Sequence, residues 1–187
     1  MATKIYIDQG HNPQNPNAGA EGNGLQEQTI TYRIGEALAA LLRANPDFEV
    51  RLSRPTPDTI LGTSNSTSLQ ARVNDANAWG ADYFISLHTN ASSIPEARGV
   101  EAFAYSRPSR AFSLGEDIVQ SLSEATGLND RGMKVRPGLY VLRRTNMPAV
   151  LVEMGFITNP TDAALMNNDP ALFARGIYNG ILEYVGG

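Results

Sequence analysis

The sequence of 187 residues has no cysteine, two histidines and no excess of basic residues. Without cysteine there can be no disulfide framework, thiolate zinc site, iron–sulfur cluster or cysteine nucleophile. The chain carries 15 Lys and Arg against 19 Asp and Glu, a formal net charge of −4, whereas a nucleic-acid-binding domain is expected to be basic. We therefore expect no nucleic-acid partner.

Long apolar runs are also missing, since no stretch reaches the roughly 18 residues of a membrane-spanning helix. We expect no membrane insertion. The N-terminus runs straight into a predicted strand and lacks the apolar core of a signal peptide. With 42% hydrophobic residues, a chain of this length can bury a full core without a disulfide or a structural metal. We predict one domain over residues 1–187 and expect a monomer.

Short apolar runs alternate with longer segments of helical period, which predicts a single α/β domain: a twisted, mostly parallel sheet of about six strands with helices on both faces. The expected strands are 5–8, 48–52, 83–87, 100–105, 139–142 and 149–152. The expected helices lie near 26–44, 68–79, 109–126 and 170–185. In the first helix, Ile30, Ile34 and Leu38 form a sheet-facing stripe. Thr67 and Gln70 predict a capping box after a polar loop, 63–68.

Both histidines lie just past a predicted strand, His11 after 5–8 and His88 after 83–87. Ligand sites in open α/β sheets form beyond the carboxyl ends of the strands. A single histidine there is usually a structural hydrogen-bonding residue, but two in such places favour a metal site.

Glu27 extends the apolar stripe of the first helix by one turn. It could simply complement the helix dipole on an exposed face. On the stripe, however, its carboxylate points toward the sheet edge, where an unpaired charge is costly and a metal or hydrogen-bonded partner is needed. His11, Glu27 and His88 would then provide three ligands with a fourth position open, as in catalytic zinc sites.

Glu153 ends the apolar run 149–152, which is typical of a buried central strand. It could be a structural partner for an arginine such as Arg72 or Arg143. Alternatively, it is a general base that takes a proton from a water activated by the metal.

The chain also resembles a known family, the zinc-dependent N-acetylmuramoyl-L-alanine amidases of bacterial cell-wall metabolism and phage lysis. The matching blocks follow the family's order over nearly the whole chain: 5–11, 24–27, 53–54, 72–77, 84–90, 99–101, 131–134, 141–143 and 148–159. The first block departs from the family pattern at Gln9, where Pro or Ala is expected.

The resemblance implies one Zn²⁺ on His11, Glu27 and His88, with Glu153 as the catalytic acid/base. The implied reaction is hydrolysis of the amide between the lactyl group of N-acetylmuramic acid and L-alanine of the stem peptide. Asn90, two residues beyond a ligand, is a candidate substrate contact. The expected partner is peptidoglycan or a muropeptide, met at the bacterial cell wall.

Two other functions stay open at this point. A zinc carboxypeptidase acting on stem peptides could use the same ligand types, with an arginine to bind a free carboxylate. A non-catalytic wall-binding module of the same fold would not need all four residues, His11, Glu27, His88 and Glu153.

Overall fold

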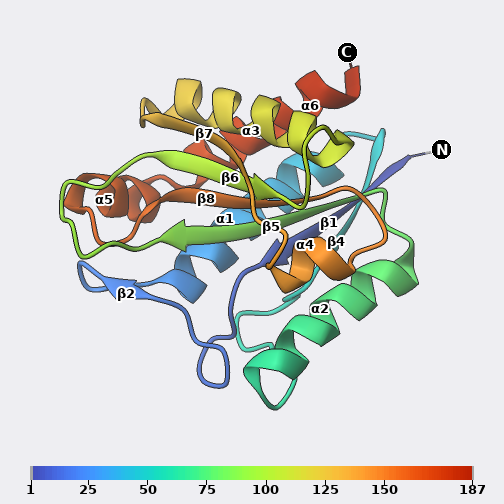
Figure 1. Cartoon of the computed structure of the whole chain (residues 1–187), viewed down its shortest axis with the longest axis horizontal. Coiled ribbons are helices and arrows are strands. Elements are labelled where there is room, and N and C mark those ends of the chain that lie inside the picture. The colour runs from blue at the N-terminus through green and yellow to red at the C-terminus, as the bar shows by residue number, and fades with distance from the viewer. Residues whose placement is uncertain (1, 187) are drawn as a thin grey trace.

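A six-stranded sheet forms the middle layer of the chain in the computed structural model, which describes residues 2–186 (Figure 1). Its strands are β1 (Thr3–Gln9), β4 (Phe48–Leu52), β5 (Tyr83–Asn90), β6 (Val100–Ala104), β7 (Asp130–Val135) and β8 (Ala149–Phe156). The strand order is β4-β1-β5-β8-β6-β7. The first four strands in this order are parallel, and β6 runs antiparallel to β8 and parallel to β7. The predicted mostly parallel α/β fold is confirmed.

Within residues 2–186 six helices pack around the sheet: α1 (Glu27–Arg43), α2 (Asn65–Trp79), α3 (Arg110–Thr126), α4 (Tyr140–Arg144), α5 (Pro160–Asn168) and α6 (Pro170–Gly186). The larger apolar core lies between one face and helices α1, α3 and α6, whereas α2 and α4 cover part of the other face (Figure 1). α5 packs near the end of β8. Within residues 2–186 no helix has the length and apolar character of a membrane span.

The strands β1, β5 and β8 are buried on both faces, which explains their nearly continuous apolar runs. They are longer than predicted, so His88 and Glu153 lie inside strands rather than just beyond them. His11 lies two residues after the end of β1. All three still lie toward the carboxyl edge of the parallel strands, where the sequence placed them.

Two sheet predictions were incomplete or wrong. Residues 139–142, predicted as a strand, lie mainly in the short helix α4, whose Val141 and Leu142 are buried against the sheet. A four-residue apolar run fits either structure, and periodicity cannot separate them. The sixth strand is instead β7, which the sequence analysis did not predict because its exposed residues at the sheet edge show no apolar pattern.

The predicted stripe of α1 is confirmed, because Ile30, Ile34 and Leu38 are buried under the sheet. The predicted capping box was placed one turn late. Ser64 is the N-cap of α2 and accepts a hydrogen bond from the backbone of Thr67, whose side chain accepts from the Ser64 backbone. Much of the predicted loop 63–68 is therefore the first turn of α2.

Candidate active site

The two histidines meet where the ends of β1 and β5 lie side by side. Their ring centroids are 4.9 Å apart, with planes at 78°. His11 adopts a left-handed conformation, with φ of 67°, which is uncommon for residues other than glycine. Gly10 permits this approach: a Cβ there would lie 2.6 Å from the His88 ring and 2.5 Å from the Leu87 carbonyl oxygen.

Glu27 lies between the two rings, at the first position of α1. Its Oε1 is 3.1 Å from His88 Nδ1, and its Oε2 is 3.2 Å from His11 Nε2. Backbone N–H groups of Thr89 and Ala20 donate to the two oxygens at 3.0 and 2.9 Å. Glu27 is 3% exposed, so the prediction of a buried, partnered acid from its position on the stripe is confirmed.

These contacts shift the pKa values of the Glu27 carboxyl and the His88 imidazole. Burial alone would raise the pKa of the Glu27 carboxyl, but hydrogen bonds and charge from His11 and His88 outweigh it and hold the pKa well below its usual range. Burial likewise opposes a charge on His88, yet the Glu27 carboxylate raises the pKa of its imidazole. An anionic carboxylate thus holds both rings in place.

One potential ligand atom from each of the three residues lies within 4.8 Å of the others. Among residues 2–186 this is the one group of three or more His, Asp and Glu side chains that meets such a criterion. Two imidazoles and a carboxylate are ligand types found in catalytic zinc sites. The predicted trio is therefore brought together, with an arrangement that fits a metal ion.

Glu153 lies beside this cluster, because β8 pairs with β5 so that Glu153 is opposite His88. Its Oε2 is buried and has no hydrogen-bond partner within the described part of the chain. Burial raises the pKa of its carboxyl to about 7, against a lowering by His88, while Glu27 adds to the rise. Such a group can both take and release a proton near neutral pH.

The arginine partners considered for Glu153 are engaged elsewhere or exposed. Arg72 pairs with Asp8 at 2.7 Å, and both side chains are almost completely buried. Arg143 is exposed on α4. Within residues 2–186 Glu153 forms no ion pair with an arginine, so neither Arg72 nor Arg143 is its structural partner.

Comparisons with known proteins identify the family. The family model described as N-acetylmuramoyl-L-alanine amidase matches residues 5–183. This chain belongs to the N-acetylmuramoyl-L-alanine amidase family. The family and the class of enzyme predicted from the sequence are thereby confirmed.

Similar family members come from several bacteria. The chain is 37% identical to the N-acetylmuramoyl-L-alanine amidase CwlM of Bacillus licheniformis, over 95% of this chain and 67% of that protein. It is 36% identical to the sporulation-specific amidase of Bacillus subtilis, over 95% and 66%. The chain thus spans about two thirds of these relatives. A solved amidase from Clostridium difficile 630 superposes with a TM-score of 0.89 at 30% identity, covering 100% of this chain and 98% of that one.

In this amidase family member, Asn90 does not point freely into solution. Its side-chain N–H donates to Glu101 Oε1 at 2.6 Å, and its Oδ1 accepts from the backbone of Ala91. Glu101 also bonds Lys134 and lies 3.5 Å from Arg131 Nε. A substrate contact of Asn90 stays a prediction, and its visible role is to join β5 to β6.

The sequence analysis also missed the role of Arg72 in this family member. Its guanidinium donates to Asp8 and to the carbonyl oxygens of Gln9 and His11, each at 2.7 Å. It thereby holds the backbone on both sides of Gly10. Gln9, the departure from the family pattern, is buried, and its side chain accepts from the Arg54 backbone.

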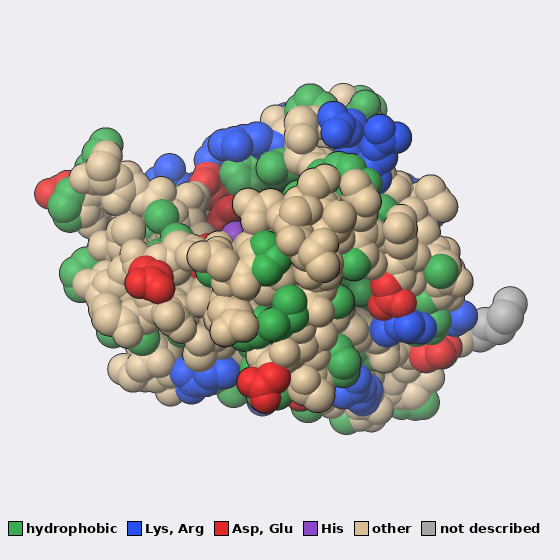
Figure 2. All heavy atoms as spheres, turned by 90° about the horizontal axis from the view of Figure 1, so that it is seen from below, with side chains coloured by type: hydrophobic (Ala, Val, Ile, Leu, Met, Phe, Trp, Pro, Cys, Tyr) green, Lys and Arg blue, Asp and Glu red, His purple; other side chains and the backbone are tan. Residues whose placement is uncertain are grey.

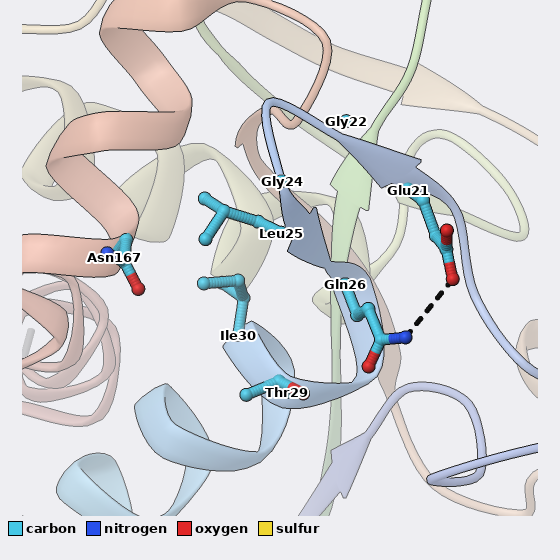
Figure 3. Close-up of a pocket in the computed structure, with 8 residues that line it drawn as sticks. All are labelled: Glu21, Gly22, Gly24, Leu25, Gln26, Thr29, Ile30 and Asn167. Carbon is cyan, nitrogen blue, oxygen red and sulfur yellow. Dashed lines mark hydrogen bonds between the residues drawn. The ribbon is translucent and has the colours of Figure 1, made fainter.

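The face of the amidase domain seen from the side of α2 is hollowed at the cluster. Figure 2 shows histidine atoms at the bottom of the hollow, with acidic side chains beside them and Lys and Arg side chains above. Figure 3 shows a different hollow of about 530 Å³, where Glu21, Gln26, Ile30 and Asn167 lie on β2 (Glu21–Gly22), β3 (Leu25–Gln26), α1 and α5. Glu21 is its one titratable lining residue and accepts from Gln26. This second hollow therefore lacks a group of titratable side chains, and the candidate active site is the cluster of His11, Glu27 and His88.

Proposed function

We propose that this chain binds one zinc ion through His11, Glu27 and His88. The proposal is supported by the donor set, by the close spacing of its ligand atoms and by the buried His11 Nδ1, which has no partner among the described residues. When bound, a zinc ion at such a site supplies Lewis-acid activation of a water and of a carbonyl oxygen.

Glu153 is the general acid/base in this proposal. Its unpartnered, buried oxygen can accept a proton from an attacking water, and the protonated carboxyl can then return that proton to the departing amide nitrogen. A pKa of about 7 suits both steps, because a group that titrates near the working pH exchanges protons most effectively. The contact between strands β5 and β8 keeps it next to His88.

The reaction is hydrolysis of the amide between the lactyl group of N-acetylmuramic acid and L-alanine of the stem peptide. The single observation that carries it is the family match over residues 5–183. An endolysin of Bacillus phage SPP1, 34% identical over 98% of this chain, agrees with it. We propose that the chain acts on peptidoglycan or muropeptides at the bacterial cell wall. The names of these relatives favour an amidase over a carboxypeptidase.

The experiment is mass spectrometry of muropeptides after digestion of purified peptidoglycan, with zinc content measured on the same protein. We expect new L-alanine amino termini and uncut glycan strands. New reducing ends would indicate a glycosidase instead. Release of D-alanine without new L-alanine termini would favour the carboxypeptidase.

Variants separate the two proposed roles. Glu153→Gln should retain zinc and lose about 10²–10⁴-fold in rate, whereas His11→Ala with His88→Ala should lose both zinc and activity. Glu116→Gln, an exposed change on α3, is the matched control and should behave as the wild type. Near-normal turnover of zinc-bound Glu153→Gln would remove Glu153 from the mechanism.

A further inference from the structure

A small hollow of about 130 Å³ opens beside the rings of His11 and His88. Apolar side chains from α2, from the start of α4 and from β8 form most of its walls: Leu69, Leu139, Tyr140, Val141 and Leu151. Asp8 and Arg72 also line it, but their charges are paired with each other. The surface offered to a ligand is therefore mainly apolar.

The hollow is close to both parts of the proposed chemistry. Leu151 and Glu153 are two residues apart on β8, so their side chains lie on the same face, about 7 Å apart along the strand. Glu153 is opposite His88, and His88 itself lines the hollow. A carbonyl group held between Glu153 and the histidines would have its neighbouring substituents within reach of this space.

The walls are not sealed into the core. Leu69, Leu139 and Tyr140 are only half-buried, so apolar surface is left facing a polar catalytic cluster. Concave apolar surface with a few polar groups at its mouth is the usual form of a ligand subsite. Its volume is well below the roughly 300 Å³ at which drug-sized ligand sites begin, which favours a small apolar group.

We propose that this hollow is a subsite for a methyl group next to the scissile amide, and that Leu69 and Leu151 make the enzyme selective for it. The inference rests on the proposed function, whose substrate carries two such groups. One is the methyl of the lactyl group, on the carbonyl side of the amide, and the other is the side chain of L-alanine, on the nitrogen side. Either methyl has the chemistry that the walls select.

The first test needs no variant and compares kcat/KM for three soluble muramoyl-peptides on the zinc-loaded protein. The parent has both methyl groups, the second has glycine in place of L-alanine, and the third has a glycolyl in place of the lactyl group. A methyl group in an apolar pocket is worth about 10- to 200-fold in kcat/KM. We expect a loss of that size for one methyl-free substrate, and its identity shows which methyl occupies the hollow.

The second test fills the hollow with Leu69→Phe on α2. This variant should lower kcat/KM for the parent substrate while leaving the sensitive methyl-free substrate nearly unchanged, so the ratio between them falls toward one. Leu69→Ala should instead improve hydrolysis of substrates with a larger group at that position. Leu182→Phe, on the exposed part of α6 at 37% exposure, is the control and should keep the wild-type ratio.

The outcomes distinguish this inference from the function on which it rests. Equal kcat/KM for all three substrates, within about twofold, would overturn the subsite while leaving the amidase reaction intact. A Leu69→Phe variant that slows every substrate equally would do the same. Failure of zinc-loaded protein to cleave any of the amides would refute the proposed function, and the subsite with it.

Discussion

The charge pair of Asp8 and Arg72 lies directly beneath the candidate metal centre, and replacing Arg72 with methionine should be one of the most damaging single changes in the chain. The guanidinium is 1% exposed and donates to Asp8, to two backbone carbonyl groups and, at 3.3 Å, to Asn12. After Arg72→Met, the hydroxyl of Ser86, at 2.7 Å, is the remaining side-chain donor to Asp8 among residues 2–186. A buried carboxylate would then lack a countercharge.

The expected loss follows from that uncompensated charge. Removing one partner of a buried ion pair costs about 3–5 kcal/mol. For a domain of this size, one kcal/mol corresponds to roughly 2–4 °C in Tm, so the fall should be roughly 6–20 °C. Because Arg72 also holds the His11 carbonyl, zinc affinity should fall about 10- to 100-fold, the usual effect of a residue that orients a metal ligand.

Urea unfolding and zinc titration of the same samples would test both expectations. Arg175→Met, an exposed change on α6, is the matched control and should stay within about 0.5 kcal/mol. The double variant Asp8→Asn with Arg72→Met should be no less stable than Arg72→Met alone, because the stranded charge is gone. A loss below about 1 kcal/mol for Arg72→Met, or unchanged zinc affinity, would refute this reasoning.

Three further predictions concern the same region. Gly10→Ala would place a Cβ 2.6 Å from the His88 ring, so it should lower the free energy of unfolding by about 1–3 kcal/mol and weaken zinc binding. Gly138→Ala is the control, because open space surrounds its Cβ, and it should have neither effect. Equal effects of the two variants would contradict the packing argument. Burial opposes the charge of Asp8, but Arg72 and Ser86 hold the pKa of its carboxyl below its usual value of about 3.9. As the pH falls, the Asp8 carboxyl therefore takes up a proton in the unfolded chain before it does so in the folded protein. The free energy of unfolding should thus fall as the pH drops below about 4. Asp8→Asn should reduce this pH dependence in urea titrations between about pH 5 and 2, and an unchanged dependence would exclude Asp8 as its cause. Chelation should remove zinc and lower Tm while far-ultraviolet circular dichroism stays native, because the core is large enough without metal; loss of the helical signal at room temperature would show a structural metal.

Much of the fold was predictable because its helices and central strands carry strong, regular patterns. The stripe Ile30, Ile34 and Leu38 has a helical period, and the apolar runs of β5 and β8 are rich in β-branched and aromatic residues, which favours strands. β7 is different, since its position at the sheet edge leaves most of its residues exposed. Only the tertiary pairing with β6 makes it a strand.

Two further features were not predicted although the sequence contains local signals for them. The sequence analysis predicted no strand in the segment just before α1, yet β2 and β3 pair there as a hairpin. Its turn is formed by Asn23 and Gly24, both with positive φ, and an Asn-Gly pair is a strong hairpin signal. α5 begins with Pro160 after an Asn159 cap, which is a helix start signal visible in the sequence. The helix was not predicted because the stronger apolar pattern of the neighbouring helix α6 was the one that was recognised.

The candidate site was predictable to the extent that its residues violate the expected pattern. Glu27 on an apolar stripe requires partners, and the structure gives its carboxylate two N–H donors and two imidazoles. The buried pairing of Arg72 could not be predicted in the same way, because an arginine on a helix is ordinarily exposed. Nothing in the neighbouring sequence shows that its partner, Asp8, lies on a strand 64 residues away. The side chains proposed to bind the metal and transfer the proton therefore stand out in the sequence as exceptions. Those that hold them in place become visible only when the strand ends have been brought together.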